Sequence, residues 1–303
     1  MARVPKILGV IGPKGGVGKT TISANLAIAL TRAGANVVAM DLDLGSANLH
    51  VVFGLRNVRH TLDDFLVNKV ASLDAVVMDT AVPGLKLIAG GNVPGIASLP
   101  YQRKVKLLRH LRKLDCDYLL LDLAAGVTNN VVDFALIAQK SLLVTTPDVP
   151  SLMSLYSFLK TSVYRRLQLL FRSSGDARLL ALLENAGDAE AHPELKTMAD
   201  FFTQAALIDP ELAERGAKVL ARFDPLILVN RVKTASDMKA GRAISNLMDQ
   251  FLGLHRGEIL SIREDAAVGA AAARMQPALL SAPDCGFALD MRKLAGALGA
   301  ASE

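Results

Sequence analysis

The sequence of 303 residues contains no tryptophan and only two cysteines, Cys116 and Cys285. Two cysteines give no disulfide framework of the kind that stabilises small secreted domains, so they favour a reducing cytosol. The five histidines are scattered, without the spacing of metal ligands. No stretch approaches the roughly 18 apolar residues in a row that a membrane-spanning helix needs. Residues 1–5 run directly into an apolar segment, so we expect no signal peptide and a cytoplasmic protein.

What the sequence does contain is a glycine-rich run, Lys14-Gly15-Gly16-Val17-Gly18-Lys19-Thr20-Thr21. In a phosphate-binding loop, G-x-x-x-x-G-K-[ST], backbone N–H groups surround the phosphates, the lysine neutralises them and the hydroxyl binds Mg²⁺. Gly18, Lys19 and Thr20 fill the last three places, but position 13 is proline, so the strict pattern fails. The additional Lys14 therefore indicates a variant of the site.

The segments on either side of this run support a phosphate site. Residues 6–11 form an apolar run that predicts a buried strand, and residues 20–33 predict a helix that ends before Gly34. A strand, a glycine loop and a helix N-terminus in this order form an anion site, because the first N–H groups of the helix point at the ligand. The alternative is a glycine-rich turn without a ligand, which these flanking elements disfavour.

Further apolar runs alternate with helical patterns along the chain. They lie at residues 36–44, 86–89, 118–123, 141–146, 225–230 and 257–261. Because their centres lack polar alternation, these strands are expected to be buried on both faces, as in a parallel sheet covered by helices. We therefore predict a doubly wound, mostly parallel α/β sheet flanked by helices, in a single domain of residues 1–303.

One region departs from this alternation. About residues 157–222 the pattern is helical throughout, and residues 176–224 carry ten acidic side chains against five basic ones, although the whole chain has a net charge of +5. The asymmetry predicts a helical insertion with a surface of its own, which could bind a protein partner. The alternative is a helical excursion that only extends the core.

Three aspartates are candidates for metal binding or catalysis beside the phosphates. Asp41 and Asp43 lie two apart at the end of the second predicted strand, so they are expected to share a face. Asp122 ends the apolar run at 118–123, where phosphate-loop proteins hold Mg²⁺ directly or through water. The alternative for Asp122 is a helix-capping carboxylate.

These residues carry a resemblance to a known family. The run Lys14–Thr21 resembles the deviant Walker A loop of the MinD/ParA ATPases, and residues 41–50 resemble their first switch. Residues 143–148 with Ser151, residues 228–231 and residues 264–277 resemble further family segments. Within the family the sequence is most similar to the FlhG/FleN-like, MinD-like regulators of flagellar number and placement.

The resemblance implies a P-loop fold that binds ATP or ADP with Mg²⁺ and forms an ATP-dependent homodimer. Lys14 would reach the phosphates held by the partner subunit, Lys19 would bind those of its own subunit, and Asp43 would position the attacking water. The implied magnesium residues are Thr20, Asp41 and Asp122. The implied nucleotide contacts are Gly15, Gly16, Val17, Gly18, Lys19, Thr20 and Thr21 at the phosphates, and Asn230 and Arg231 at adenine.

Some features depart from the family. Residues 291–303 lack the bulky aromatic side chains of a membrane-docking helix, so membrane association is expected to be weak or absent. Because residues 1–5 lead directly into the first predicted strand, we also expect no N-terminal extension that activates a partner GTPase, and residues 123–126 stand where the family has a glycine-rich turn. These departures weigh against membrane recruitment and against the flagellar role.

Basic side chains recur on one predicted helix, residues 102–114. Arg103, Lys106, Arg109 and Lys113 share a face, which could bind DNA, anionic lipid or an acidic partner, or could be a solvated surface. A second mixed stretch, residues 156–172, is a candidate membrane-surface or partner helix, with packing against the core as the alternative.

The sequence leaves three function classes. The first is a slow ATP hydrolase that dimerises as a switch and positions a polar structure such as flagella or the division machinery, with a peripheral or polar location through a partner. The alternative is a ParA-like ATPase that partitions DNA. The third is a metal or iron–sulfur carrier, against which Cys116 precedes the strand of Asp122 instead of following it.

Overall fold

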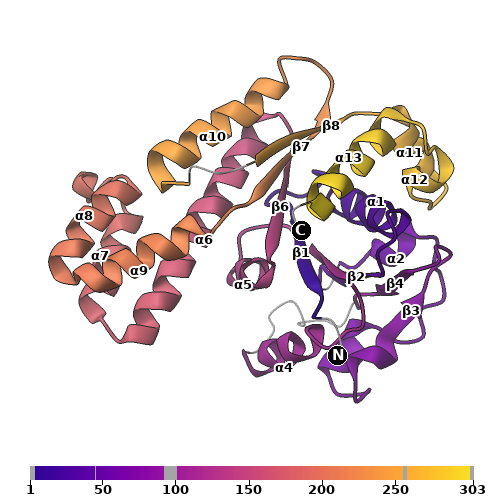
Figure 1. The fold of residues 1–303 in the computed structure, drawn as a ribbon, viewed down its shortest axis with the longest axis horizontal. Helices are drawn as coiled ribbons and strands as arrows, with labels where there is room; N and C mark the ends of the chain where they lie inside the picture. Colours follow the sequence, from indigo (N-terminus) through magenta and orange to yellow (C-terminus); the bar gives the residue numbers. More distant parts are fainter. Residues whose placement is uncertain (1–3, 45, 92–100, 255–257, 301–303) are drawn as a thin grey trace.

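The computed structural model of the chain describes residues 4–44, 46–91, 101–254 and 258–300. Its centre is an eight-stranded sheet in the order β3-β4-β2-β5-β1-β6-β7-β8 (Figure 1). The strands are β1 Lys6–Ile11, β2 Val37–Leu42, β3 Val77–Asp79, β4 Leu85–Ile88, β5 Tyr118–Leu123, β6 Lys140–Thr145, β7 Leu226–Val232 and β8 Glu258–Arg263. Neighbouring strands are parallel except β3 and β4, which are antiparallel. The predicted doubly wound α/β architecture is confirmed.

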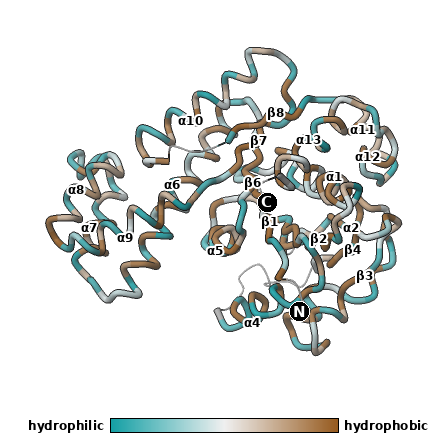
Figure 2. The backbone as a smooth tube through the Cα atoms, viewed as in Figure 1, coloured by the Kyte–Doolittle hydropathy of each residue, from teal (hydrophilic) through white to brown (hydrophobic). Residues whose placement is uncertain are grey.

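The apolar runs in the sequence predicted every strand of the sheet except β3. Every predicted run overlaps an observed strand, although the run at 257–261 begins at Gly257, outside the described residues. The edge strand β3 was missed because its three residues are too few to produce a pattern. In Figure 2 the strands in the middle of the sheet are largely brown, whereas the outer helices mix brown and teal.

Helices cover both faces of the sheet. The helices are α1 Lys19–Arg32, α2 Leu49–Val52, α3 Leu62–Leu66, α4 Tyr101–Leu111, α5 Asn129–Ile137, α6 Val149–Ser174, α7 Ala177–Gly187, α8 Met198–Ile208, α9 Pro210–Ala221, α10 Met238–Leu252, α11 Ala266–Ala273, α12 Ala278–Ser281 and α13 Gly286–Ala300, with short 3₁₀ turns at Leu73–Val76 and Pro193–Leu195. None of the helices in the described residues is long and apolar enough to cross a membrane.

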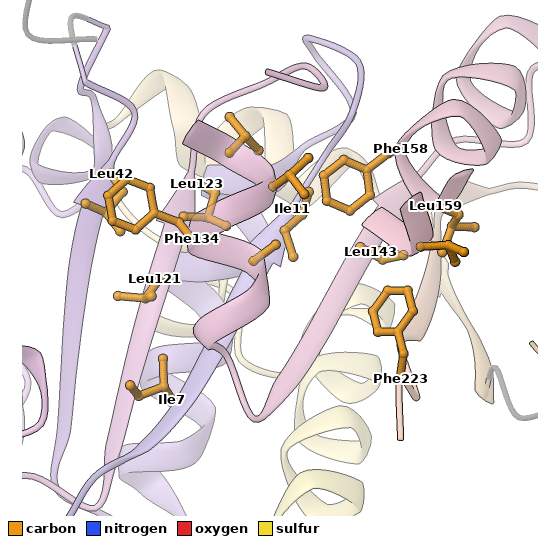
Figure 3. Packing of buried hydrophobic residues seen from close by; sticks show 14 of the residues in the cluster. Ile7, Ile11, Leu42, Leu121, Leu123, Phe134, Leu143, Phe158, Leu159 and Phe223 are labelled. Carbon is orange, nitrogen blue, oxygen red and sulfur yellow. The ribbon is translucent and has the colours of Figure 1, made fainter. Parts of the chain in front are cut away.

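Alternate side chains of each central strand enter two different cores. Leu8 and Val10 of β1 pack in one buried cluster with α1 and α13, while Ile7 and Ile11 join the cluster on the other face. Figure 3 shows this second cluster, where Phe134 of α5 and Phe158 of α6 lie among side chains of the central strands. Burial on both faces explains why the strands lack polar alternation.

The helical region from α6 to α9 projects away from the sheet (Figure 1). It begins at Val149, so the expected boundary near residue 157 falls inside the 26-residue helix α6. No strand lies among its residues 149–221, all of which the structure describes. Its buried side chains, such as Phe171 and Phe201, belong to the same apolar cluster as the sheet. The region therefore extends the main core while also presenting new surface.

Candidate nucleotide-binding site

The glycine-rich loop joins β1 to α1 at the carboxyl edge of the sheet, where open α/β sheets bind ligands. Gly16 and Gly18 have φ values of 80° and 96°, which other residues rarely adopt. No side chain caps the first turn of α1, because Gly18 occupies the N-cap position. The N–H groups of that turn are therefore available to a bound anion.

Two close approaches explain glycine in the loop. A Cβ atom on Gly18 would lie 2.5 Å from the Asn230 side-chain nitrogen, which donates a hydrogen bond to the Val17 carbonyl at 2.8 Å. A Cβ atom on Gly12 would overlap the aliphatic part of the Lys19 side chain. Gly12 lies one residue before the place where the strict pattern requires glycine, so our motif comparison missed it. Gly12 could have been found from the sequence as the glycine that directly follows the first predicted strand, residues 6–11.

Lys19 is buried with a relative exposure of 8%, and its charge acts on both Asp43 and Asp122. Thr20 and Thr21 follow it in the first turn of α1, with the Thr20 hydroxyl beside the Asp122 carboxylate. The second lysine of the motif therefore lies close enough to Asp122, the penultimate residue of β5, for its charge to act on that carboxylate. The site thus has one buried lysine, Lys19, and two buried carboxyl groups, Asp41 and Asp122, at the point where phosphates and a metal ion would bind.

Asp122 and Asp41 lie side by side because they are paired in register on β5 and β2. One Asp122 oxygen accepts a hydrogen bond from the Ser23 hydroxyl at 2.8 Å, and the other is buried without a hydrogen-bond partner. Burial, followed by the charge of Asp41, raises the pKa of Asp122 to about 7. An unpartnered, buried carboxylate oxygen beside a hydroxyl suits a divalent cation, which would replace the missing partner and favour the charged form.

Asp41 is engaged differently. Its two oxygens accept backbone hydrogen bonds from Asp43, Asn48 and Leu49 at 2.9 to 3.0 Å. Burial raises its pKa, and those N–H groups act in the opposite direction. These contacts favour a role in fixing the segment after β2 over direct metal binding. A part for Asp41 in the magnesium site stays a prediction.

Asp43 lies just past the end of β2, so it does not share a strand face with Asp41 in the way the sequence suggested. It is half-buried, and burial raises its pKa while the charge of Lys19 lowers it. Gly45, within the motif at 41–50, lies outside the described residues. Asp43 is therefore placed beside the phosphate lysine and is open enough to contact water.

Lys14 occupies a different position from Lys19. Its ammonium group lies 3.1 Å from Asp148, and the two side chains are 42% and 47% exposed. Asp148 caps α6 by accepting the Ser151 N–H at 3.0 Å, and it also accepts the Thr146 hydroxyl. The hydrogen bond from Thr146, with others from Ser151 and Lys14, holds the pKa of Asp148 well below its usual range. Asp148 belongs to the segment 143–148 that resembles the family, and no local pattern in the sequence indicates its contact with Lys14.

The predicted adenine residues border a cavity of 220 Å³ next to the loop. Asn230, Arg231, Gly18 and Thr21 are among its lining residues. Arg231 has a φ of 60°, which is uncommon for a residue other than glycine. One N–H of the Asn230 amide is bound to the Val17 carbonyl, so its second N–H and its oxygen are left for a base.

The structure gives less support to two other predicted features, the basic helix and an iron–sulfur site. On the basic helix, Lys106 does not join a free cationic face, because it bonds Asn68 at 2.5 Å and lies over the Phe65 ring. No group of three or more metal-ligating side chains occurs within the described ranges. Cys116 is buried, and burial raises the pKa of its thiol to about 12, which does not suit a bridging iron–sulfur cluster.

Comparison with known proteins agrees with this geometry. Residues 8–278 match the CobQ/CobB/MinD/ParA nucleotide binding domain. The chain is 31% identical over 209 residues to the antiactivator FleN of Pseudomonas aeruginosa, covering 67% of this chain and 71% of FleN. It is 34% identical over 147 residues to the septum site-determining protein MinD of Helicobacter pylori, covering 48% and 54%.

The chain thus spans about half the length of the septum-site relatives that it matches. Among solved structures, MinD of Pyrococcus horikoshii complexed with Mg-ADP is similar with a TM-score of 0.62 and 21% identity, over 97% of this chain and 96% of that one. At that identity the likeness concerns the fold.

Proposed function

The chain belongs to the CobQ/CobB/MinD/ParA family of nucleotide-binding proteins, and on that basis we propose that it is a slow ATPase switch that dimerises with ATP and Mg²⁺. The observation that carries the proposal is the different placement of the two loop lysines. Lys19 is buried beside Asp43 and Asp122, whereas Lys14 lies at the loop surface, partly exposed and paired with Asp148. An exposed cation next to a phosphate site can act on a nucleotide in a second subunit, where it stabilises charge only when the dimer is closed.

The residues take separate roles in this proposal. Lys19 and the first N–H groups of α1 bind the phosphates, and Thr20 with Asp122 holds the metal ion. Mg²⁺, when bound, neutralises charge on the β and γ oxygens. Asp43 orients the attacking water, and Asn230 with Arg231 borders the base. Hydrolysis to ADP and phosphate would then release the segment after β2, which Asp41 holds through Asp43, Asn48 and Leu49.

We further propose that the switch regulates a polar structure, such as a flagellum or the division machinery, through a protein partner. The FleN match supports this because it covers about two thirds of both chains, more than the MinD matches do. DNA partitioning is less favoured, because Lys104 and Lys106 of the basic helix already bond Asp133 and Asn68.

Size-exclusion chromatography with light scattering tests the proposal by comparing ADP with a non-hydrolysable ATP analogue. We expect a monomer with ADP and a dimer with the analogue and Mg²⁺. Lys14→Ala should keep nucleotide binding but lose dimer-dependent hydrolysis, whereas Lys19→Ala should weaken nucleotide binding itself. A protein that stays monomeric with the analogue would overturn the proposal. Duplex DNA or vesicles added to the ATP-bound sample test the alternative activating surfaces.

A further inference from the structure

The end of α4 meets the start of β1 at the amino edge of the sheet, far from the phosphate loop. After α4 the chain passes through the buried Leu114 and Cys116 into β5, and Ile7 exchanges hydrogen bonds with Gln139 before β6. The loop follows the other end of β1. Six residues of strand separate the two edges, which corresponds to about 20 Å.

A hollow of 450 Å³ opens at this edge. Its floor is apolar and is made by Val105, Leu108 and Leu111 of α4, with Ile7 of β1 and Ile137 of α5. Leu111 and Ile7 are part of the buried core, while Val105, Leu108 and Ile137 are partly exposed. We call this hollow, together with the three basic residues described next, the α4 groove.

Three basic side chains, Arg109, Arg112 and Lys113, border the floor. All three are exposed, and none forms an ion pair with any described residue. Their neighbours in α4 differ, because Lys104 is paired with Asp133 at 2.6 Å and Lys106 bonds Asn68. Lys104 and Lys106 are thus engaged by neighbouring side chains, whereas the three cations around the hollow have no ion-pair partner within the part of the chain that the structure describes.

The shape and charge of the α4 groove select among possible occupants. A lipid surface is flat and binds side chains that project into it, so it would not fill a hollow whose apolar atoms lie at the bottom. Duplex DNA would use the cations but would leave the apolar floor uncovered. A helix with apolar side chains on one face and carboxylates beside them would fill the floor and pair with the rim at the same time.

We propose that the α4 groove binds an acidic amphipathic helix of a partner protein, with the partner's apolar side chains on the floor and its carboxylates on Arg109, Arg112 and Lys113. Because the groove lies at the sheet edge opposite the phosphate loop, binding should be the same with ADP and with ATP. The interaction therefore does not rest on the proposed ATPase cycle, and it would let the switch stay attached to one partner while its nucleotide state changes.

The test uses a fluorescent synthetic peptide as the probe and anisotropy as the readout. The peptide carries Leu at i, i+3, i+4 and i+7 and Glu at the flanking positions. We expect saturable binding that weakens with salt, with equal affinity in ADP and in a non-hydrolysable ATP analogue. Peptides with Lys in place of every Glu, or Ser in place of every Leu, should not bind.

Protein variants locate the binding surface. Arg109→Glu should weaken binding by roughly twofold to thirtyfold, because one exposed charge attraction is lost and a repulsion of similar size replaces it. Arg103→Glu is the matched control, since Arg103 is an exposed cation on the same helix that does not line the groove. Val105→Thr, which keeps the shape of the floor while adding a hydroxyl group, should also weaken binding.

The proposal is overturned by any of three results. The peptide does not bind, the Lys-containing peptide binds equally well, or Arg103→Glu weakens binding as much as Arg109→Glu. Retention of the protein on anionic vesicles or on duplex DNA through Arg109, without peptide binding, would assign the surface to a different partner class and would equally overturn it. Circular dichroism of each variant separates loss of the surface from loss of the fold.

Discussion

The ion pair between Lys14 and Asp148 should oppose dimerisation, because the proposed dimer needs Lys14 at the partner's nucleotide. The pair has an N–O distance of 3.1 Å, and both side chains are almost half exposed. Exposed pairs of this kind contribute ~0.2–1 kcal/mol. A dimer breaks two of them, so removing the pair should tighten the dimer dissociation constant by roughly 2- to 30-fold.

Asp148→Asn is the variant that isolates this effect. Asparagine is as good an N-cap as aspartate, so α6 should keep the hydrogen bond that Ser151 N–H now donates to Asp148. Thr146 and Ser151 hydroxyl groups can accept from the new amide in place of donating to the carboxylate. The substitution therefore removes the charge that holds Lys14 while leaving the cap in place.

Sedimentation velocity with a non-hydrolysable ATP analogue and Mg²⁺ measures the dimer dissociation constant. Glu214→Gln is the matched control, because it removes a carboxylate from another exposed pair, with Lys218 in α9. We expect the control to leave the constant unchanged and Asp148→Asn to lower it. An unchanged or weaker dimer in Asp148→Asn, with a normal melting temperature, would refute the reasoning. It would mean that the Lys14–Asp148 ion pair does not oppose dimerisation.

Three further predictions concern the site itself. Asp43→Asn should lower the ATPase rate by about 10²- to 10⁴-fold while nucleotide affinity measured by calorimetry stays the same, because Asp43 acts on water and not on the nucleotide. Gly18→Ala should weaken nucleotide binding, since the new Cβ meets the Asn230 side chain at 2.5 Å in a residue with φ of 96°; an affinity equal to the parent would contradict this. Asp122→Asn should change the pH dependence of stability. The raised pKa of about 7 means that the metal-free folded state holds a proton that the unfolded state loses, so the free energy of unfolding should fall as the pH rises from about 4 to about 7, by at most about 4 kcal/mol. Urea unfolding without Mg²⁺ should show a larger fall in the parent than in Asp122→Asn, which keeps the contributions of Asp41 and Asp43 because burial raises the pKa of those carboxyls too. Asp122→Asn should be the more stable protein above about pH 7.

Much of the fold follows from local patterns in the chain. The apolar runs predicted the central strands because a parallel sheet covered on both faces leaves no room for polar alternation. The loop motif located the phosphate site because its glycines and lysine must be contiguous. Residues 77–79 gave no such signal, since an edge strand of three residues is specified by its partner β4 more than by its own sequence.

Contacts between distant segments could not be predicted in this way. Lys14 and Asp148 are 134 positions apart, and only the order of strands β1 and β6 in the sheet brings their loops together. The basic helix failed as a continuous face for the same reason. Lys106 shares a helix face with Arg109, but Asn68 and the Phe65 ring come from α3 and the turn after it and engage that lysine alone.

The two buried aspartates, Asp41 and Asp122, are neighbours on adjacent strands but have different surroundings and therefore different roles. Asp41 and Asp122 occupy equivalent places on neighbouring strands, and both are fully buried. Two adjacent carboxylates cannot both be charged without compensation. Asp41 obtains three backbone N–H donors because the chain turns back over it after β2. Asp122 instead faces the hydroxyl groups and Lys19 of α1, and one of its oxygens has no hydrogen-bond partner. The oxygen that lacks a hydrogen-bond donor therefore belongs to Asp122, and a bound cation at that oxygen would couple nucleotide loading to the stability of the β5 and α1 junction.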